Sequence, residues 1–311
     1  MTTPRARRWL WALQAAVTVA VLVLVGRALA RNWAEFRSLQ VTLDIRAGWL
    51  ALAALVVFFT YALYIESWRR LLAGWAQRIP FRAAARAWCL ANLGRYLPGK
   101  IWSVAGLVVL AERAGVHGGA AAASAFASQA LILGAGAAVV AAATPRATSA
   151  VRLAAAVLVA VATVGALVWK PTANRLGRLL NTATPLAPLH PSAVAAAGSL
   201  MIFGWLTYGL SFWLLARGLL PGAALPLATA VGTFALSYLL GMLALFAPGG
   251  VGVRELVLVS LLAPHLGSGG AVAVSVGSRV LLTLTEAGAA GVSVLIASPP
   301  PSRESMSEHS S

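Results

Sequence analysis

The stretch FAPGGVGVRE, residues Phe246–Glu255, lies between two apolar runs and interrupts them. Pro248 has no backbone N–H, so it ends any helix that arrives from the N-terminal side. Gly249, Gly250 and Gly252 allow a tight turn and leave room for another group to approach the backbone. The stretch therefore predicts a helix that breaks at Pro248 and resumes a few residues later.

The second helix of this pair is predicted to begin near Val251, beside Arg254. Its first N–H groups have no partner inside the helix, and its positive dipole end faces the break. A broken helix inside a bilayer is tolerated only where protein buries it or where it lines a polar cavity. The segment therefore predicts the floor of an anion site. The alternative is a tight loop at the membrane surface, in which Arg254 and Glu255 are solvated.

A similar break occurs in the first half of the chain, in RYLPGKIW at positions 95–102. Pro98 and Gly99 align with Pro248 and Gly249 at a constant offset of 150 positions (248 − 98). Interrupted apolar segments at matching positions of two halves are typical of the binding site of a transporter. The repeated break therefore favours a carrier over a surface loop.

Charged side chains accompany both breaks. Arg95 and Lys100 flank the first break and are predicted to bind an anion, with snorkelling to the membrane surface as the alternative. Arg279 and Glu286 fall on one helical face of the last apolar run, at 272–296. Ionisable residues at that depth are costly and normally face the interior of a bundle. Both are therefore candidates for the site, and a structural contact with other helices is the alternative.

The composition predicts a polytopic membrane protein. The chain is 60% hydrophobic and only 10% charged, with a mean hydropathy of +0.83. Its formal net charge of +16 is spread between apolar runs, which favours anionic membrane lipid over nucleic acid as the partner. A single cysteine, Cys89, allows no internal disulfide, and the sequence predicts neither a metal site nor a cofactor.

The apolar runs and loop charges predict an all-α fold, a polytopic helix bundle with two re-entrant hairpins. Basic connections without acids, at 69–86 and 170–191, are placed in the cytoplasm together with both termini. The hairpins then open from opposite sides, so two half-repeats, about 47–143 and 193–297, form an inverted repeat. One transmembrane domain is expected at 1–297 and a disordered cytoplasmic tail at 298–311. Spans are predicted at 9–25, 49–68, 119–143, 151–169, 193–216 and 272–296, whereas 225–245 fits either a full span or half a hairpin.

Other polar and aromatic residues receive structural roles. Glu66 lies four positions before Arg70, which predicts an ion pair along a helix. Trp205, Tyr208 and Trp213 are predicted to pack in the bundle or anchor it at the membrane surface. A ligand cage built from these aromatic rings is the less favoured alternative.

Two motifs, NLGRYLPGKIW (Asn92–Trp102) and APGGVGVRE (Ala247–Glu255), resemble the membrane region of lysylphosphatidylglycerol synthases. The resemblance extends over roughly Trp9–Ala297. In the full-length synthases this membrane half is associated with flipping of the modified lipid, and a separate soluble domain transfers the aminoacyl group. This chain ends at Ser311 with no room for that domain, so we do not expect the transferase activity. Relatives often carry an acid–Arg pair near Ser128-Gln129, and this sequence lacks it.

The favoured function is an ATP-independent flippase or carrier in the cytoplasmic membrane. Its substrate would be an anionic or aminoacylated phospholipid or a polyprenyl-phosphate-type lipid. Glu255 and Glu286 are assigned to balance charge in the empty site or to carry a coupling proton, and no catalytic residue is predicted. The residues predicted to bind the lipid phosphate are Arg95, Pro98, Gly99, Lys100, Pro248, Gly249, Gly250, Gly252, Arg254 and Arg279.

Two other classes of function stay open. A membrane-embedded transferase acting on lipid phosphate would need a catalytic acid near the motifs, and Glu255 is the candidate there. A scaffold for lipid-modifying enzymes would move no lipid itself. The sequence also leaves open a homo-oligomer and a partnership with a lipid-modifying enzyme.

Overall fold

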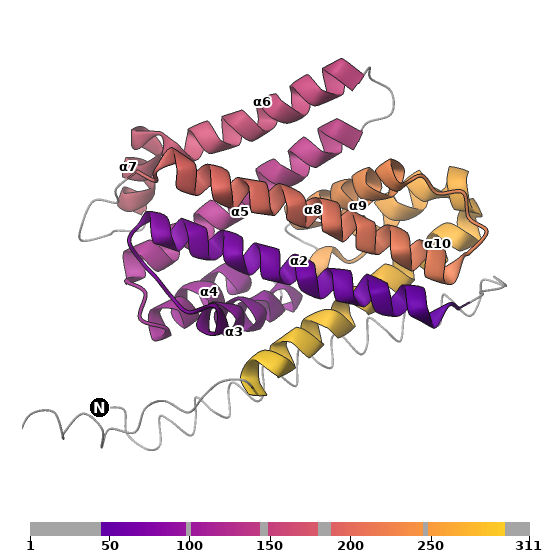
Figure 1. Cartoon of the computed structure of the whole chain (residues 1–311), viewed down its shortest axis with the longest axis horizontal. Helices are drawn as coiled ribbons and strands as arrows, with labels where there is room; N and C mark the ends of the chain where they lie inside the picture. Colours follow the sequence, from indigo (N-terminus) through magenta and orange to yellow (C-terminus); the bar gives the residue numbers. More distant parts are fainter. Residues whose placement is uncertain (1–44, 98–100, 144–148, 180–187, 245–247, 296–311) are drawn as a thin grey trace, which may run out of the picture.

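The computed structural model describes residues 45–97, 101–143, 149–179, 188–244 and 248–295. Throughout these residues the ordered elements are helical, which confirms the predicted all-α fold (Figure 1). The predicted span at 9–25 and the tail at 298–311 lie outside the described residues. The elements are α2 (Ala47–Gly74), α3 (Phe81–Asn92), η1 (Leu93–Tyr96), α4 (Ile101–Arg113), α5 (Gly118–Ala143), α6 (Ser149–Val168), α7 (Lys170–Leu179), α8 (Pro191–Leu219), α9 (Leu227–Leu243), η2 (Pro248–Gly250) and α10 (Val253–Leu295), where η marks a 3-10 turn.

Five helices of the described part are long and apolar enough to cross a membrane, namely α2, α5, α6, α8 and α10. They overlap the spans predicted at 49–68, 119–143, 151–169, 193–216 and 272–296, and the predictions at 151–169 and 272–296 run one residue past the ends of α6 and α10. The protein is therefore a multi-pass membrane protein. Helix α9 has 17 residues, which is short of the roughly 20 that a complete span needs.

Helices α2 and α8 form the centre of the bundle and lie side by side (Figure 1). Thr60 Oγ1 and Thr207 Oγ1 are 2.8 Å apart, and Ser67 Oγ donates to the carbonyl of Ala197 at 2.9 Å. Residue numbers rise along one helix as they fall along the other, so the two helices are antiparallel. Gly204 permits this close approach, because a Cβ there would overlap the ring of Tyr64.

Each predicted break lies between two helices. The first is flanked by α3, which has 12 residues, and α4, which has 13, and these two pack against each other. Both are too short to span a bilayer alone. The second break follows α9 and contains η2, where Gly249 and Gly250 have positive φ angles of 60° and 71°. Such angles are rarely adopted by other residues, which explains the glycines at these two positions.

Helix α10 contains both the arm that follows the second break and the last predicted span. It turns at Gly267, where φ is 69° and ψ is 163°, without an irregular loop. Arg279 contacts Glu255, and the two lie 12 positions on either side of Gly267 (279 − 267 and 267 − 255). The two arms of α10, before and after Gly267, therefore lie side by side and run in opposite directions.

The connection predicted at 170–191 differs from the structure, because α7 occupies its first part. Pro171 stands in the first turn of α7, where a missing N–H removes no hydrogen bond. Arg175 and Arg178 are exposed, so the positive charge of this connection lies on a helix rather than on an irregular loop.

Buried aromatic rings fill the centre of the bundle. Trp205 and Tyr208 are buried, and Trp205 Nε1 donates to the carbonyl of Ile132 at 2.9 Å. Trp213 Nε1 donates to the carbonyl of Leu225 at 2.9 Å. These contacts confirm the packing roles predicted for the three aromatic residues.

Candidate functional site

A cavity of about 210 Å³ lies where the two breaks meet. The first half of the chain contributes Arg95 from η1 and Asn92 from the end of α3. The second half contributes Gly249 and Gly250 from η2 and Arg254 from the first turn of α10. The remaining walls come from α2, α3, α4, α5, α8 and α9, and include Tyr64, Trp88, Ser103, Val104, Leu107, Ser128, Gln129, Ile132, Met201, Tyr238, Gly241 and Met242.

Arg254 is the most unusual residue of this cavity. Only 8% of it is exposed, and its Nε is buried without a hydrogen-bond partner among the described residues. Its guanidinium carbon lies 4.5 Å from the centroid of the Tyr238 ring and 5.7 Å from that of Phe234. No carboxylate in the described part of the chain forms an ion pair with it. Among the described residues, this buried positive charge has aromatic rings beside it and no anion, which is a costly arrangement.

Two glycines make room for the stem of Arg254. A Cβ at Gly241 of α9 would overlap Cγ of Arg254. A Cβ at Gly250 would lie 2.9 Å from Cα of Gly241 and 3.1 Å from Cδ of Arg254. Gly250 of the second break thus permits a close approach, as predicted, and the group that approaches is Arg254 itself.

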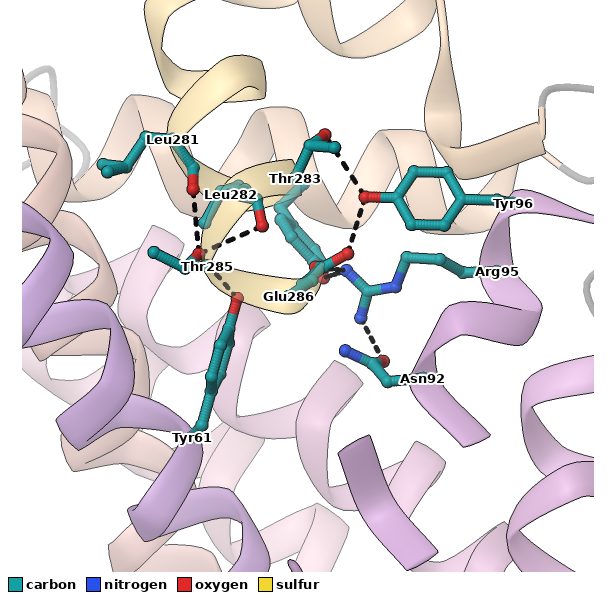
Figure 2. A network of polar contacts seen from close by, with 10 residues as sticks. Tyr61, Asn92, Arg95, Tyr96, Leu281, Leu282, Thr283, Thr285 and Glu286 are labelled. Atoms are coloured by element: carbon teal, nitrogen blue, oxygen red, sulfur yellow. Dashed lines mark hydrogen bonds and ion pairs between the residues drawn. The ribbon is translucent and has the colours of Figure 1, made fainter. Parts of the chain in front are cut away.

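Arg95 is the second guanidinium of the cavity, and it is paired (Figure 2). Its Nη1 donates to Oε1 of Glu286 at 2.6 Å and to the hydroxyl of Tyr238 at 2.5 Å. Nη2 donates to Oδ1 of Asn92. The hydroxyl of Tyr96 donates to Oε2 of Glu286 at 2.6 Å, so both oxygens of this carboxylate are engaged. The pair joins the first break to α10.

A second ion pair lies at the start of α10. Arg279 Nε donates to Oε1 of Glu255 at 2.6 Å, and the backbone N–H of Gly252 donates to Oε2 of Glu255 at 2.7 Å. Glu255 therefore satisfies one of the free N–H groups at the helix start, where the dipole also favours a negative charge. Arg279 does not line the cavity, although its Nη1 lies 3.9 Å from the position of a Cβ at Gly249.

The predicted site residues thus fall into two layers. Arg95, Gly249, Gly250 and Arg254 line the cavity. Behind them lie the charged residues that pair, Arg279 with Glu255 and Glu286 with Arg95, together with Gly252 and Pro248, which begins η2. Pro98, Gly99 and Lys100 lie outside the described residues.

Several residues in the lining of the cavity or beside it were not predicted from the sequence. Tyr96 and Tyr238 hold the Arg95–Glu286 pair, and Trp88 and Tyr64 form an aromatic wall. Aromatic residues inside apolar runs have the same pattern as ordinary core residues, so their spacing carries no signal. The position of Tyr96, directly after Arg95 and before Pro98 and Gly99, is the one hint that the sequence offered.

The structure also confirms the polar face predicted on the last span. Arg279 and Glu286 are buried, with 7% and 3% exposed, and Ser275 and Thr283 are buried beside them. Near the C-terminal end of α2, the predicted ion pair is present, with Arg70 Nε 2.8 Å from Oε1 of Glu66. Arg69 also contacts this carboxylate.

Comparison with known proteins gives one family. The family model of the lysylphosphatidylglycerol synthase TM region matches residues 11–286. A comparison with curated proteins gives no match. The matched range contains both breaks and every charged residue of the cavity. Because the match covers most of the chain, the protein belongs to the family of the lysylphosphatidylglycerol synthase TM region, whose members are membrane proteins that handle lipids.

Proposed function

We propose that this protein is an ATP-independent carrier that moves a phosphate-bearing lipid across the membrane, with the phosphate bound at Arg254. The observation that carries this proposal is a buried arginine with no ion pair among the described residues, lining a cavity between two broken segments. Membership of a lipid-handling membrane family supports a lipid as the substrate.

A phosphate suits this arginine for geometric as well as electrostatic reasons. The planar guanidinium presents its donors in a fork that matches two phosphate oxygens. Arg254 also lies in the first turn of α10, so the helix dipole favours the same negative charge. An anionic headgroup would therefore offset the cost of burying Arg254.

Alternating access is supported by the order of the elements. A long helix, a short helix, a 3-10 turn, a second short arm and a second long arm occur in α2–α5 and again in α8–α10. The long helices that begin these two series, α2 and α8, are antiparallel. We therefore propose that the half-repeats, about 47–143 and 193–297, are inverted, with the broken segments as re-entrant hairpins.

The same proposal gives the two carboxylates a role. Glu286 holds Arg95, and Glu255 holds Arg279, so these two arginines are neutralised when the cavity is empty. Protonation of Glu286 would release Arg95 to the incoming phosphate, which makes this carboxylate the candidate for proton coupling. Glu255, the acid that a transferase would need, is engaged by Arg279 and by the N–H of Gly252.

Lipid movement in proteoliposomes tests the proposal. Purified protein is reconstituted with labelled phosphatidylglycerol, and the label is followed by its accessibility and by mass spectrometry. We expect movement of unchanged lipid in the wild type and its loss in Arg254→Gln. Arg70→Gln, which removes an arginine whose side chain is 55% exposed, is the matched control and should retain activity. A new lipid product would instead identify an enzyme, and neither movement nor product would favour a scaffold.

A further inference from the structure

The described lining of the cavity contains positive side chains but no negative ones. Arg95 and Arg254 line it, whereas none of the described residues that line it is an acid. Both oxygens of Glu286 are engaged, one by Arg95 and one by Tyr96. Pairing of Arg95 with Glu286 leaves the charge of Arg254 without a counter-charge among the described residues, so their contribution to the empty cavity is positive.

We propose that the cavity selects a phosphate headgroup that carries no ammonium group, that is, a phosphate ester of a neutral alcohol. This inference rests on the proposed function and narrows its substrate. An ammonium group in the cavity would meet two guanidinium groups and no free carboxylate among the described residues. Like charges in a site of low dielectric repel strongly.

The ring of Tyr238 does not replace the missing acid. The ring of Tyr238 already holds Arg254, whose guanidinium carbon lies 4.5 Å from its centroid. The guanidinium carbon of Arg95 lies 5.7 Å from the same centroid. Tyr238 therefore has little capacity left to attract a further cation.

The neutral lining suits hydroxyl groups. Ser128 Oγ is buried without a hydrogen-bond partner among the described residues, and Gln129 and Asn92 also line the cavity. Hydroxyl and amide groups donate to and accept from an alcohol, and an unsatisfied buried hydroxyl favours such a partner. The volume of about 210 Å³ is below the ~300–1,000 Å³ of pockets for drug-sized ligands, so a compact headgroup fits best.

Binding of matched lipids to the purified protein tests the selection. Native mass spectrometry would compare phosphatidylglycerol, phosphatidylethanolamine and lysyl-phosphatidylglycerol with identical acyl chains. We expect phosphatidylglycerol to bind at least tenfold more tightly than the lysyl lipid, with phosphatidylethanolamine between them. Equal or tighter binding of the lysyl lipid would overturn the inference, while movement of that lipid in proteoliposomes would leave a lipid carrier intact.

A variant that adds an acid to the cavity makes the test sharper. Gln129→Glu changes an amide of the lining to a carboxylate of nearly the same shape. We expect it to lower the preference for phosphatidylglycerol over the lysyl lipid at least tenfold. Gln77→Glu is the matched control, because Gln77 accepts from the N–H of His117 and does not line the cavity. An unchanged preference in Gln129→Glu, with the control also unchanged, would contradict the charge argument.

Free phosphate is the other source of the same chemistry. In a separate arm, inorganic phosphate alone competes against phosphatidylglycerol for the wild-type protein and for Arg254→Gln. We expect phosphate to displace the lipid only at concentrations at least a hundredfold higher, because the lipid tails add binding free energy. Displacement at equal concentrations would overturn the assignment to a lipid headgroup.

Discussion

The two breaks meet at one cavity but carry charge in different ways. At the first break Arg95 is held by Glu286, whereas at the second break Arg254 has aromatic rings and no acid among the described residues. The offset of 150 positions relates Arg254 to Val104 and Arg279 to Gln129 (254 − 104 and 279 − 129). Val104 and Gln129 both line the cavity, yet neither is charged. Arg254 and its counterpart Val104 therefore face the same space, whereas Arg279 lies behind the cavity that its counterpart Gln129 lines.

This difference distinguishes the residues that a repeated fold requires from the residues that a binding site requires. Repeated breaks need Pro and Gly in both halves, because each half must end a helix and turn the backbone in the same way. One phosphate needs one uncompensated guanidinium, and a second in the matching position would add like-charge repulsion. The changes below would break or sharpen this comparison.

The largest expected effect follows from removing the partner of Arg95. Glu286→Gln would remove a carboxylate whose side chain is only 2% exposed and leave Arg95, whose side chain is 25% exposed, without its ion-pair partner. Breaking a buried ion pair by removing one partner costs about 3 kcal/mol of folding free energy at the low end of the measured range. Thermal unfolding in detergent would show it as a lower Tm. Glu255→Gln is the comparison, and because its side chain is 23% exposed we expect a smaller shift. Equal decreases in Tm for the two variants would show that the two ion pairs contribute equally to stability, which would contradict this comparison.

The second-largest effect is expected when the side chain of Arg254 is displaced but its charge is kept. Gly241→Ala places a Cβ against Cγ of Arg254, so the stem of this side chain must shift. We expect anionic lipid binding to weaken by about 1–3 kcal/mol, the size of a hydrogen bond to a charged group. Gly165→Ala is the control, because a Cβ there meets nothing within 4 Å. Wild-type affinity in Gly241→Ala would mean that the position of Arg254 does not matter.

A smaller effect is expected from the hydroxyl of Tyr238. Tyr238→Phe removes the acceptor of Arg95 Nη1 and keeps the ring that supports Arg254. We expect a loss of about 1 kcal/mol of folding free energy, the usual net value of one hydrogen bond, with lipid binding retained. Unfolding and lipid titration of the same preparation would check both halves of this expectation. A collapse of binding at unchanged stability would show that the hydroxyl contacts the headgroup.

The smallest effect is expected outside the cavity. Glu66→Gln removes the partner of Arg69 and Arg70 on α2, where the side chain of Arg70 is 55% exposed. Exposed ion pairs contribute about 0–1 kcal/mol, so stability and lipid binding should both change little. A large loss of lipid movement in this variant would place part of the pathway at this end of α2.

Much of the fold could be predicted from the sequence, because it depends on apolar runs and on Pro and Gly. The spans at α2, α5 and α8 and the two breaks follow from those patterns alone. The helix α7 was missed because a basic stretch after Pro171 has the composition of a loop. Among the site residues, Arg254 and Arg95 could be found because charge within an apolar run is rare.

The pairing of charges could not be predicted. Glu286 and Arg95 are 191 positions apart, and only the tertiary fold brings them together. Glu255 directly follows Arg254 in the sequence, yet its carboxylate accepts from Arg279, and Arg254 has no ion pair among the described residues. The aromatic support from Tyr238 was hidden for the same reason, since it depends on how α9 packs against the start of α10.

The most direct test of the central claim, that Arg254 receives the lipid phosphate, is a titration of phosphatidylglycerol against the wild type, Arg254→Lys and Arg254→Gln. Lysine keeps the charge but loses the planar fork, so we expect Arg254→Lys to bind about 1–3 kcal/mol more weakly and Arg254→Gln more weakly still. The folded fraction of each variant would be measured in the same sample by thermal unfolding. Wild-type affinity in both variants, with both folded, would contradict the claim and leave Arg95 as the remaining described guanidinium that lines the cavity.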